Sequence, residues 1–582
     1  MVLAALALVL LPQLSVPPLE RAEVYFMDAA RTMAEGGDWL VPRYEGRPFF
    51  DKPILSYWLM AACMKALGPT PAAARLVAVV SALALVLATA WLGALLFDRR
   101  TGLLGAVALA TTLGFLSFAR MAMSDMLLAV WTTLAAALLV RAWQPAPPSW
   151  LLPAAGAALG LGLASKGPIA LLIPALALVP LLAQERRVPP WRPGALALAA
   201  LAFAVLGLGW FVLLFLRLGW EPLQHFFLRE NLERFAGEAY DVGRPPWFYL
   251  PAYLAQGLPW SAFLPVALLR LLSAPAPERR SSWLLGLWPA LVLVPISLSR
   301  GKIDYYLLPI YPAVSLLVGR YFAALRWGRL DRAWARLVLA VAAGAAVWTA
   351  VRPPALPPRW LPSRAVCVAA AVVLLLAAAA LVAAAVRPLA SRVLGALAGA
   401  TAALALLVNA FFLPAFARAQ PNRAIARDVA RERLYEPRAR LAYCDDPSHA
   451  RRDVLFEARH AALEQCDVWG LAAARQRYLL LLSPAQDASL RALPKYRLVA
   501  SYRFLPAGTL TLGGLLSPVT PGTIILGANF ATADPVAEVT RRREYRHAVR
   551  ADIEAAARRT GGLGGGARQN EGSHEQPGPE HP

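Results

Sequence analysis

Long apolar runs recur along the chain and constrain its fold more than any other feature. A helix needs about 20 predominantly apolar residues to cross the hydrocarbon core of a bilayer. Hydrophobic residues make up 58% of the 582 residues and charged residues only 16%, which is unusual for a water-soluble globule. We therefore predict a polytopic α-helical membrane protein with about 13 spans. The candidate spans are 1–17, 73–97, 102–118, 124–143, 150–165, 168–184, 194–218, 259–272, 282–298, 306–323, 336–352, 364–386 and 391–416.

The positive charge of the chain lies mostly in short gaps between these runs. Lys and Arg number 58 against 36 Asp and Glu, a formal net charge of +22. Gaps such as "FDRRTG", "QERRVPPWRPG" and "PERRSS" are typical of cytoplasmic loops. We infer anionic membrane lipids as partners and exclude nucleic acid. An odd number of spans then places the N-terminus in the cytoplasm and the C-terminus outside it.

The first segment lacks a basic n-region and an A-x-A cleavage motif, so we interpret it as a short membrane helix and not a removed signal. Residues 18–72 form the first extracytoplasmic loop. Within this loop, residues 22–39 have helical spacing that stops at Gly36, and residues 54–68 are apolar but too short to be a clear span. We expect both to be helices that lie on the outer membrane surface.

Three regions follow from the change of composition along the chain. We assign 1–419 to a transmembrane domain. Polar residues and short β-like runs return in 420–535, which predicts a small α/β or α+β extracytoplasmic domain. We expect a basic helix and a disordered tail in 536–582. The four cysteines show neither a zinc-ligand spacing nor a disulfide framework.

A charged pair stands at the edge of an apolar stretch in "RPFFDKPILSYWLMAACMKALG". Pro53 restricts Lys52 to an extended conformation and allows a helix to begin at the proline. Asp51 and Lys52 would then lie at a helix N-terminus, where backbone N–H groups and an ammonium favour a phosphate. The alternative is a capping aspartate beside a lysine that snorkels to the membrane surface.

Other charges fall on the same predicted membrane face. Asp125 ends "FARMAMSD" directly before an apolar run, where it is either a functional carboxylate or a helix cap. Lys166 in "ASKGP" is either a topogenic charge or an anion contact. Lys302 in "SRGKIDYY" adds a further cation, followed by Tyr306. The loop 225–260 supplies Arg234 and several aromatics, which either cover lipid or surround an anionic lipid head.

Acids and bases gathered on one membrane face can hold a lipid phosphate and remove a proton from an acceptor. A carboxylate near a hydroxyl serves as general base, and cations stabilise charge on a departing phosphate. The sequence contains no Walker A motif, no GxGxxG and no Ser-His-Asp set. Nucleotide-driven transport and serine hydrolysis therefore lack support.

The motifs together resemble a known family. "ERAEVYFMDAARTMAEGGDWLVPRYEGRPFFDKPILSYWL" resembles the first extracytoplasmic loop of the aminoarabinose transferase and protein O-mannosyltransferase family, membrane glycosyltransferases with the GT-C fold. "RMAMSD", "SKGP", "RENLERF" and "SRGKIDYYLLPIYP" are similar to further landmarks of that family in the same order. The resemblance covers roughly residues 18–320.

The resemblance implies roles for individual residues. Asp125 matches an acid in the second extracytoplasmic loop of the family, and Lys52 matches a lysine that meets the carrier phosphate. Asp51 matches an acid that in some members helps to bind a metal. Arg234 and Tyr306 fall on positions that resemble further phosphate contacts.

The sequence also departs from the family pattern. The first catalytic aspartate of the family falls on Ala22, which leaves Glu23, with Glu20 as a second choice, to replace it. A position that resembles a metal-binding histidine is Asn231. Asp51 is then the only candidate ligand for a divalent metal, and no other cofactor is predicted.

The resemblance implies a glycosyltransferase of a bacterial inner membrane. It would move a sugar from a polyprenyl-phosphate carrier to a lipid A-like, glycan or protein acceptor on the extracytoplasmic face. We expect Asp125 to act with Glu23 or Asp51 on the acceptor. The carrier phosphate would be bound by Lys52, Lys166, Arg234, Lys302 and Tyr306. Two alternatives are a flippase or transporter for lipid-linked sugars and a catalytically impaired binding homologue. The sequence identifies neither the sugar nor the acceptor.

Overall fold

The computed structural model describes most of the first 419 residues and part of the rest. The described residues of that first part are 1–419 without 18–20, 45, 176–178, 180–190, 238–242, 273–275, 324–326 and 352–363. Beyond it, the structure describes 425, 428–429 and the strands 440–443, 464–465, 478–482, 497–504 and 522–528. The predicted basic helix and tail in 536–582 lie outside the described residues.

Seven helices of the described part are long and apolar enough to cross a membrane, or eight if a helix pair bent by 105° is one span. The chain is therefore a multi-spanning membrane protein. The seven are α4 (Pro71–Leu96), α7 (Asp125–Trp143), α10–η1–α11 (Pro193–Leu218), η6–α17 (Asp304–Ala323), α18 (Arg329–Val351), α19 (Arg364–Val386) and α20–η8–α21, apolar over Ala390–Ala415. The bent pair is η4 (Pro246–Phe248) with α14 (Tyr249–Gln256) against η5 (Trp260–Phe263) with α15 (Leu264–Leu272).

Several expected spans are shorter or interrupted in the structure. The segment 102–118 is divided into two helices at Thr111 and Thr112, whose hydroxyls donate to the backbone carbonyls of Val107 and Ala108. Part of 168–184 lies outside the described residues. The total of 13 spans therefore stays a prediction. Shorter helices are α1 (Val2–Leu10), α5 (Arg99–Ala110), α6 (Leu113–Phe118) and α8 (Leu151–Lys166). The helix α16 (Ala276–Leu298) is longer, but only Trp283–Leu298 of it counts as an apolar helix.

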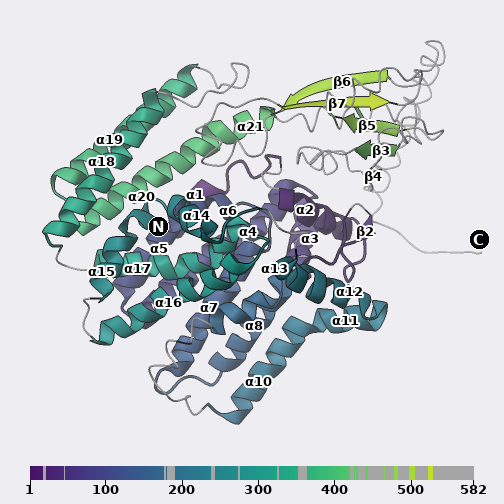
Figure 1. Ribbon diagram of the computed structural model, residues 1–582, viewed down its shortest axis with the longest axis horizontal. Coiled ribbons are helices and arrows are strands. Elements are labelled where there is room, and N and C mark those ends of the chain that lie inside the picture. Colours follow the sequence, from purple (N-terminus) through teal and green to yellow (C-terminus); the bar gives the residue numbers. More distant parts are fainter. Residues whose placement is uncertain are drawn as a thin grey trace, which may run out of the picture.

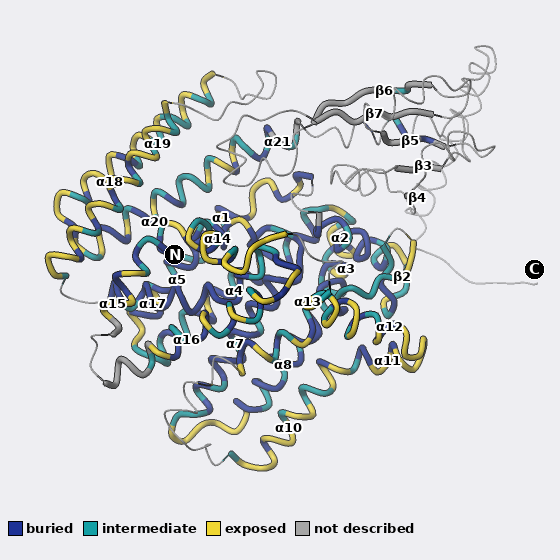
Figure 2. Tube along the Cα trace, in the orientation of Figure 1, coloured by how far each residue is buried: buried dark blue, intermediate teal, exposed yellow. Residues whose placement is uncertain are grey.

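The spans divide into an inner and an outer group. In η6–α17, 89% of the apolar window is buried by other parts of the protein, against 11% in α19. Figure 2 shows the same contrast, with dark blue along α17 and α4 and extensive yellow along α18, α19 and α10. Because lipid tails are as apolar as leucine, an exposed apolar helix is stable in a bilayer. The outer helices therefore present their apolar surface to lipid.

The inner helices approach closely where glycines meet. Gly319 of α17 packs against Gly105 of α5, and a Cβ atom added at Gly319 would lie 2.4 Å from the Gly105 nitrogen. Small residues at such crossings let helix backbones approach in membranes.

Replacing Gly319 with alanine is expected to lower stability by about 1–3 kcal/mol, because the added methyl group overpacks a backbone contact. Gly344 in α18 is the matched control, since a Cβ there would meet no heavy atom within 4 Å. The melting temperatures of G319A and G344A in detergent test this. Equal temperatures for both variants and the parent protein would contradict the close contact.

The two helices expected within 18–72 are present as α2 (Arg21–Ala34) and α3 (Leu55–Leu67). Between them lies a short hairpin of β1 (Arg43–Tyr44) and β2 (Arg47–Pro48), with Gly46 at φ 77° in its turn. Gly36 at φ 105° ends the α2 region as predicted. The prediction that α3 begins at Pro53 is wrong by two residues, because Ile54 is the N-cap residue.

The segment after α11 is irregular. It contains α12 (Glu221–Gln224), the nine-residue π-helix η2 (His225–Glu233) and α13 (Arg234–Ala236). A π-helix has i→i+5 hydrogen bonds and is frequently found at functional sites. Figure 1 shows that α12 and α13 lie near α2 and α3, although about 170 residues separate these segments in the sequence.

A mixed five-stranded sheet follows the last helix. Its strands are β3 (Arg440–Tyr443), β4 (Glu464–Gln465), β5 (Tyr478–Leu482), β6 (Arg497–Phe504) and β7 (Gly522–Ala528), in the order β4-β3-β5-β7-β6. β3 is parallel to β4 and β5, whereas β7 is antiparallel to β5 and β6. The predicted α/β or α+β domain in 420–535 thus contains a sheet, and its boundaries stay a prediction.

Candidate active site

Two of the predicted phosphate ligands share one buried carboxylate. Arg234 donates to the Glu230 carboxylate over 2.6 Å, and the Lys52 ammonium donates to the same oxygen over 3.2 Å. Lys52 also donates to the Asp51 carbonyl over 2.7 Å. Glu230 is 7% exposed and was not predicted from the sequence. The contact joins the first loop to the π-helix across 178 residues of sequence.

The second charged pair joins two membrane helices. Asp125 is the first residue of α7 and Lys166 is the last residue of α8. Their side chains form a hydrogen-bonded ion pair that is 5% exposed at the acid and 11% exposed at the lysine. The Lys166 ammonium also lies 4.5 Å from the centre of the Tyr306 ring and 5.3 Å from that of Tyr305. Asp125 is thus neither a simple helix cap nor an unpaired charge.

Tyr25 on α2 connects the two pairs. Burial raises the pKa of its phenol above the ordinary value, and the Arg234 charge partly offsets this rise. The charges of Asp125 and Asp51 act on the same phenol. Lys166 likewise lies within electrostatic range of Lys52 and Arg234. Both pairs therefore belong to one site, and Tyr25, which sequence analysis missed, is a neutral hydrogen-bond donor within it.

Lys52 is held in a partly dehydrated position. Burial lowers the pKa of its ammonium from the ordinary value, and the neighbouring Glu230 opposes this lowering. An ammonium that has lost water gains from an additional anion. This arrangement suits a cation that binds a phosphate.

Lys302 occupies a different environment from the other cations. It is 6% exposed, and its ammonium donates to the Ser299 carbonyl over 2.5 Å. The neighbouring Arg300 backbone N–H donates to the Phe235 carbonyl over 3.1 Å, which ties this loop to α13. In the described contacts, Lys302 thus stabilises its own loop. Its role as a phosphate ligand stays a prediction. Tyr306, in contrast, lies within electrostatic range of Arg234.

The structure argues against Glu23 as a base that faces the substrate. Glu23 is fully buried and forms a bidentate ion pair with Arg75, with both N–O distances 2.9 Å. It also accepts a hydrogen bond from the Ala122 backbone N–H over 2.8 Å. These charge-assisted hydrogen bonds occupy the carboxylate oxygens that a substrate proton would need. The described contacts of Glu23 are therefore structural, its role as a catalytic acid stays a prediction that this geometry does not favour, and Glu20 lies outside the described residues.

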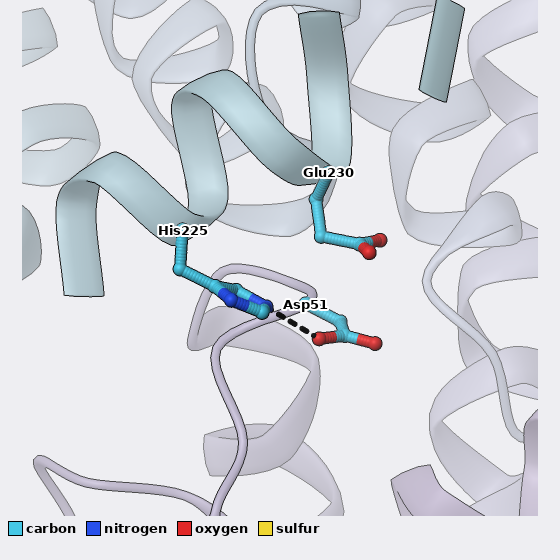
Figure 3. Close-up of side chains that lie close together, drawn as sticks. All are labelled: Asp51, His225 and Glu230. Atoms are coloured by element: carbon cyan, nitrogen blue, oxygen red, sulfur yellow. Dashed lines mark hydrogen bonds and ion pairs between the residues drawn. The ribbon is translucent and has the colours of Figure 1, made fainter. Parts of the chain in front are cut away.

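Asp51 lies beside a histidine that the sequence did not single out. The His225 Nε2 atom is 3.0 Å from the Asp51 carboxylate, and Glu230 lies beside them (Figure 3). Ligand atoms of all three residues lie within 4.8 Å of one another. Asn231, at the position that resembles the family histidine, instead donates to the Phe226 carbonyl. The π-helix thus supplies His225, which lies six residues before the position of the family histidine.

One imidazole and two carboxylates form a donor set that suits Zn²⁺ or a similar divalent ion. His225 and Glu230 are five residues apart, and the π-helical i→i+5 register brings them to the same side. In an α-helix of 3.6 residues per turn they would be about 140° apart. The residues present therefore fit a metal site, and Asp51 is not its only candidate ligand.

Replacing His225 with alanine is expected to weaken Zn²⁺ binding at least about tenfold, because one of three ligands is lost. Equilibrium dialysis of the purified protein, with bound metal measured by mass spectrometry, tests this. E233Q is the matched control, because Glu233 is an exposed carboxylate of the same π-helix. Equal Zn²⁺ affinity in H225A and the parent protein would exclude this set of ligands.

Part of the chain is similar in sequence to known proteins. Residues 51–210 match the family model for dolichyl-phosphate-mannose-protein mannosyltransferase. Undecaprenyl phosphate-alpha-4-amino-4-deoxy-L-arabinose arabinosyl transferases from Pseudomonas aeruginosa and Sodalis glossinidius are 34% and 33% identical over 310 and 311 residues. The matches cover 51% and 52% of this chain and 54% and 55% of those proteins. The chain thus spans about half the length of the curated relatives it matches.

The fold is similar to that of a solved membrane protein. A crystal structure of ArnT from Cupriavidus metallidurans bound to undecaprenyl phosphate has a TM-score of 0.72 at 22% identity, covering 92% of this chain and 98% of that one. Its apo form has a TM-score of 0.71 at 21% identity.

Fold and site together define the class of this chain, a multi-spanning helical membrane protein with a GT-C-like fold and a charged site at the ends of its helices. The family match and the curated relatives confirm the more particular resemblance to the aminoarabinose transferase and protein O-mannosyltransferase family.

Proposed function

We propose that this chain is a membrane glycosyltransferase that moves a sugar from a polyprenyl-phosphate carrier to an acceptor on the extracytoplasmic face. The observation that carries the proposal is the single site in which Lys52 and Arg234 lie near the Asp125–Lys166 pair. This site offers cations for a phosphate and an acid for an acceptor. Relatives named for undecaprenyl phosphate support a carrier of this kind.

The carrier phosphate is bound by Lys52 and Arg234 in this proposal. Both cations already bind the Glu230 carboxylate, so the site is built to hold an anionic oxygen. Tyr306 and the Tyr25 phenol lie around the same position. A divalent cation at Asp51, His225 and Glu230 would neutralise Glu230 and leave the positive charge of Lys52 and Arg234 facing the phosphate.

Asp125 acts on the acceptor. Its carboxylate accepts the proton of the acceptor hydroxyl as the hydroxyl oxygen forms a bond to the anomeric carbon. The bond between that carbon and the phosphate oxygen breaks, and its electron pair leaves with polyprenyl phosphate. Positioning and charge stabilisation supply most of the acceleration, since phosphate is already a good leaving group. Lys166 holds the Asp125 carboxylate in place through their ion pair.

The finer features are part of the same proposal. The relatives named for 4-amino-4-deoxy-L-arabinose support a pentose as the sugar, and we propose a lipid A-like molecule as the acceptor, ahead of a glycan or a protein. We place the protein in a bacterial inner membrane with the site and the five-stranded domain outside the cytoplasm. Arginine-rich gaps between the spans support this orientation.

The test is release of polyprenyl phosphate from a labelled polyprenyl-phosphate sugar by the purified protein in lipid vesicles. A glycosyltransferase releases the carrier in step with labelled product. A flippase moves the labelled lipid across the vesicle membrane without releasing the carrier phosphate. A binding homologue, which the alanine at position 22 would favour, retains the lipid unchanged. Either of the last two results would reject the proposal.

A further inference from the structure

A buried arginine joins three segments of the chain, which are α4, α2 and residues 14–17. Arg75 lies on α4 and is fully buried. It donates to Glu23 twice, over 2.9 Å from Nε and 2.9 Å from Nη2. Its remaining donors reach the backbone carbonyls of Leu14, Val16 and Pro17 over 2.7, 2.6 and 3.1 Å. All five N–H groups of the guanidinium are thus used, which fixes the orientation of the Glu23 carboxylate.

Glu23, held by Arg75, in turn binds the loop that precedes α7. Its Oε1 atom accepts a hydrogen bond from the Ala122 backbone N–H over 2.8 Å, three residues before Asp125. Ala122 and Ser124 are buried, and the Met123 N–H closes a tight turn onto the Met121 carbonyl over 2.8 Å. The short, buried segment between the Ala122 amide and the Asp125 carboxylate therefore has little freedom to move.

The other end of the loop is anchored in the same way. Arg120 is 6% exposed and hydrogen-bonds the Asn409 side chain and the Pro12 carbonyl. The loop is therefore held at residues 120 and 122 by hydrogen bonds to distant parts of the sequence. Such anchoring is what a catalytic side chain needs, because a displacement of about 1 Å can reduce a rate by about 100-fold.

We infer that Glu23 is a positioning residue: held by Arg75, it fixes the 119–124 loop through the Ala122 amide and so sets the Asp125 carboxylate against Lys166. This inference rests on the proposed function. Glu23 lies next to Ala22, where the family has its catalytic aspartate, yet it serves the acid of the second loop without touching the substrate. The acid of the first loop thus positions Asp125 and does not act on the substrate.

The test compares E23Q and E23D with the parent enzyme. Removing the charge from one partner of a buried ion pair can unfold a protein. E23D keeps the charge opposite Arg75 and shortens the side chain by one methylene, which withdraws its oxygen from Ala122. In both variants that fold, kcat is expected to fall by about 10- to 100-fold. The KM for the carrier-linked sugar is expected to stay within about threefold, because Lys52 and Arg234 are unchanged.

A double-variant series separates positioning from general damage. In a D125N background, E23D is expected to have no further effect on kcat, because the carboxylate that it positions is already gone. D331N is the matched control. Asp331 is 1% exposed, binds Arg270 and accepts from the Tyr321 hydroxyl, at the opposite end of the η6–α17 span. D331N should lower the melting temperature but leave kcat of the folded enzyme unchanged.

A readout that is independent of activity makes failure of the two proposals distinguishable. Acetylation of lysines by a water-soluble reagent, mapped by mass spectrometry, reports whether Asp125 still protects Lys166. Lys166 labelling in E23D should rise toward its level in D125N, while Lys52 labelling stays constant. Wild-type kcat with protected Lys166 in folded E23D, or an equal kcat loss in D331N, would overturn the inference. Full activity of D125N would instead overturn the proposed role of Asp125, and Lys166 labelling would still decide the role of Glu23.

Discussion

Replacing Asp125 with asparagine is expected to abolish sugar transfer, with kcat falling by about 10²- to 10⁴-fold. Asparagine has nearly the same shape as aspartate but cannot accept the proton of an acceptor hydroxyl. It also removes the negative charge that pairs with Lys166. This loss is costly because the two side chains are only 5% (Asp125) and 11% (Lys166) exposed. Initial rates with a labelled polyprenyl-phosphate sugar measure the loss.

The control for this variant is D98N. Asp98 also lies at the start of a helix, where it caps α5 through Thr101, but its side chain is 48% exposed and its partners lie on α5 and α17. D98N should retain transfer, and D125N should still bind polyprenyl phosphate with nearly unchanged affinity. If D125N kept more than about a tenth of the parent rate, Asp125 would not be the acid that acts on the acceptor.

Replacing Lys52 with alanine is expected to lower kcat/KM for the carrier-linked sugar by about 10²- to 10³-fold, because a cation that stabilises charge on the departing phosphate is lost. The change also leaves the Glu230 carboxylate, at 7% exposure, with less positive charge around it. Lower affinity for the carrier and slower release of polyprenyl phosphate should both be seen in the vesicle assay.

Two variants sharpen this prediction. Lys65 on the following helix is exposed and lies 5.9 Å from the centre of the Trp39 ring, so K65A removes a lysine of the same loop without touching the site. K65A should have the parent rate. K52R should recover only part of the activity, because a planar guanidinium does not reproduce the geometry of an ammonium. Parent activity in K52A membranes would remove the phosphate role from Lys52.

The membrane character and most of the charged site could be predicted from the sequence. Apolar runs of span length are a local property, so α4, α7, α19 and the helices around them follow from a window of about 20 residues. Lys52 and Asp125 stand out because a charge at the edge of such a run is costly unless it is used. The motifs around them resemble those of the family in type and order. These features require no knowledge of which helices are neighbours.

Contacts between distant segments could not be predicted in this way. In the sequence, Glu230 is one of several charges in the loop 225–260, and the structure shows that it binds two cations, one of them 178 residues away. The sequence does not single out His225, because His225 and Glu230 lie on the same side only in the π-helical register. A period of 3.6 residues does not bring them together. Asp51, which the sequence offers as a catalytic acid, lies 3.0 Å from the Nε2 atom of this histidine.

By itself, the sequence determined that the chain spans a membrane, that its useful charges stand at the ends of apolar helices, and that these charges suit a lipid phosphate. Only the tertiary structure decided how the charges pair. It assigned Glu23 to Arg75, Lys166 to Asp125, and Lys52 with Arg234 to Glu230. The physical reason is that hydropathy reports the local environment of a residue, whereas an ion pair depends on which helix ends the packing brings within about 3 Å of each other.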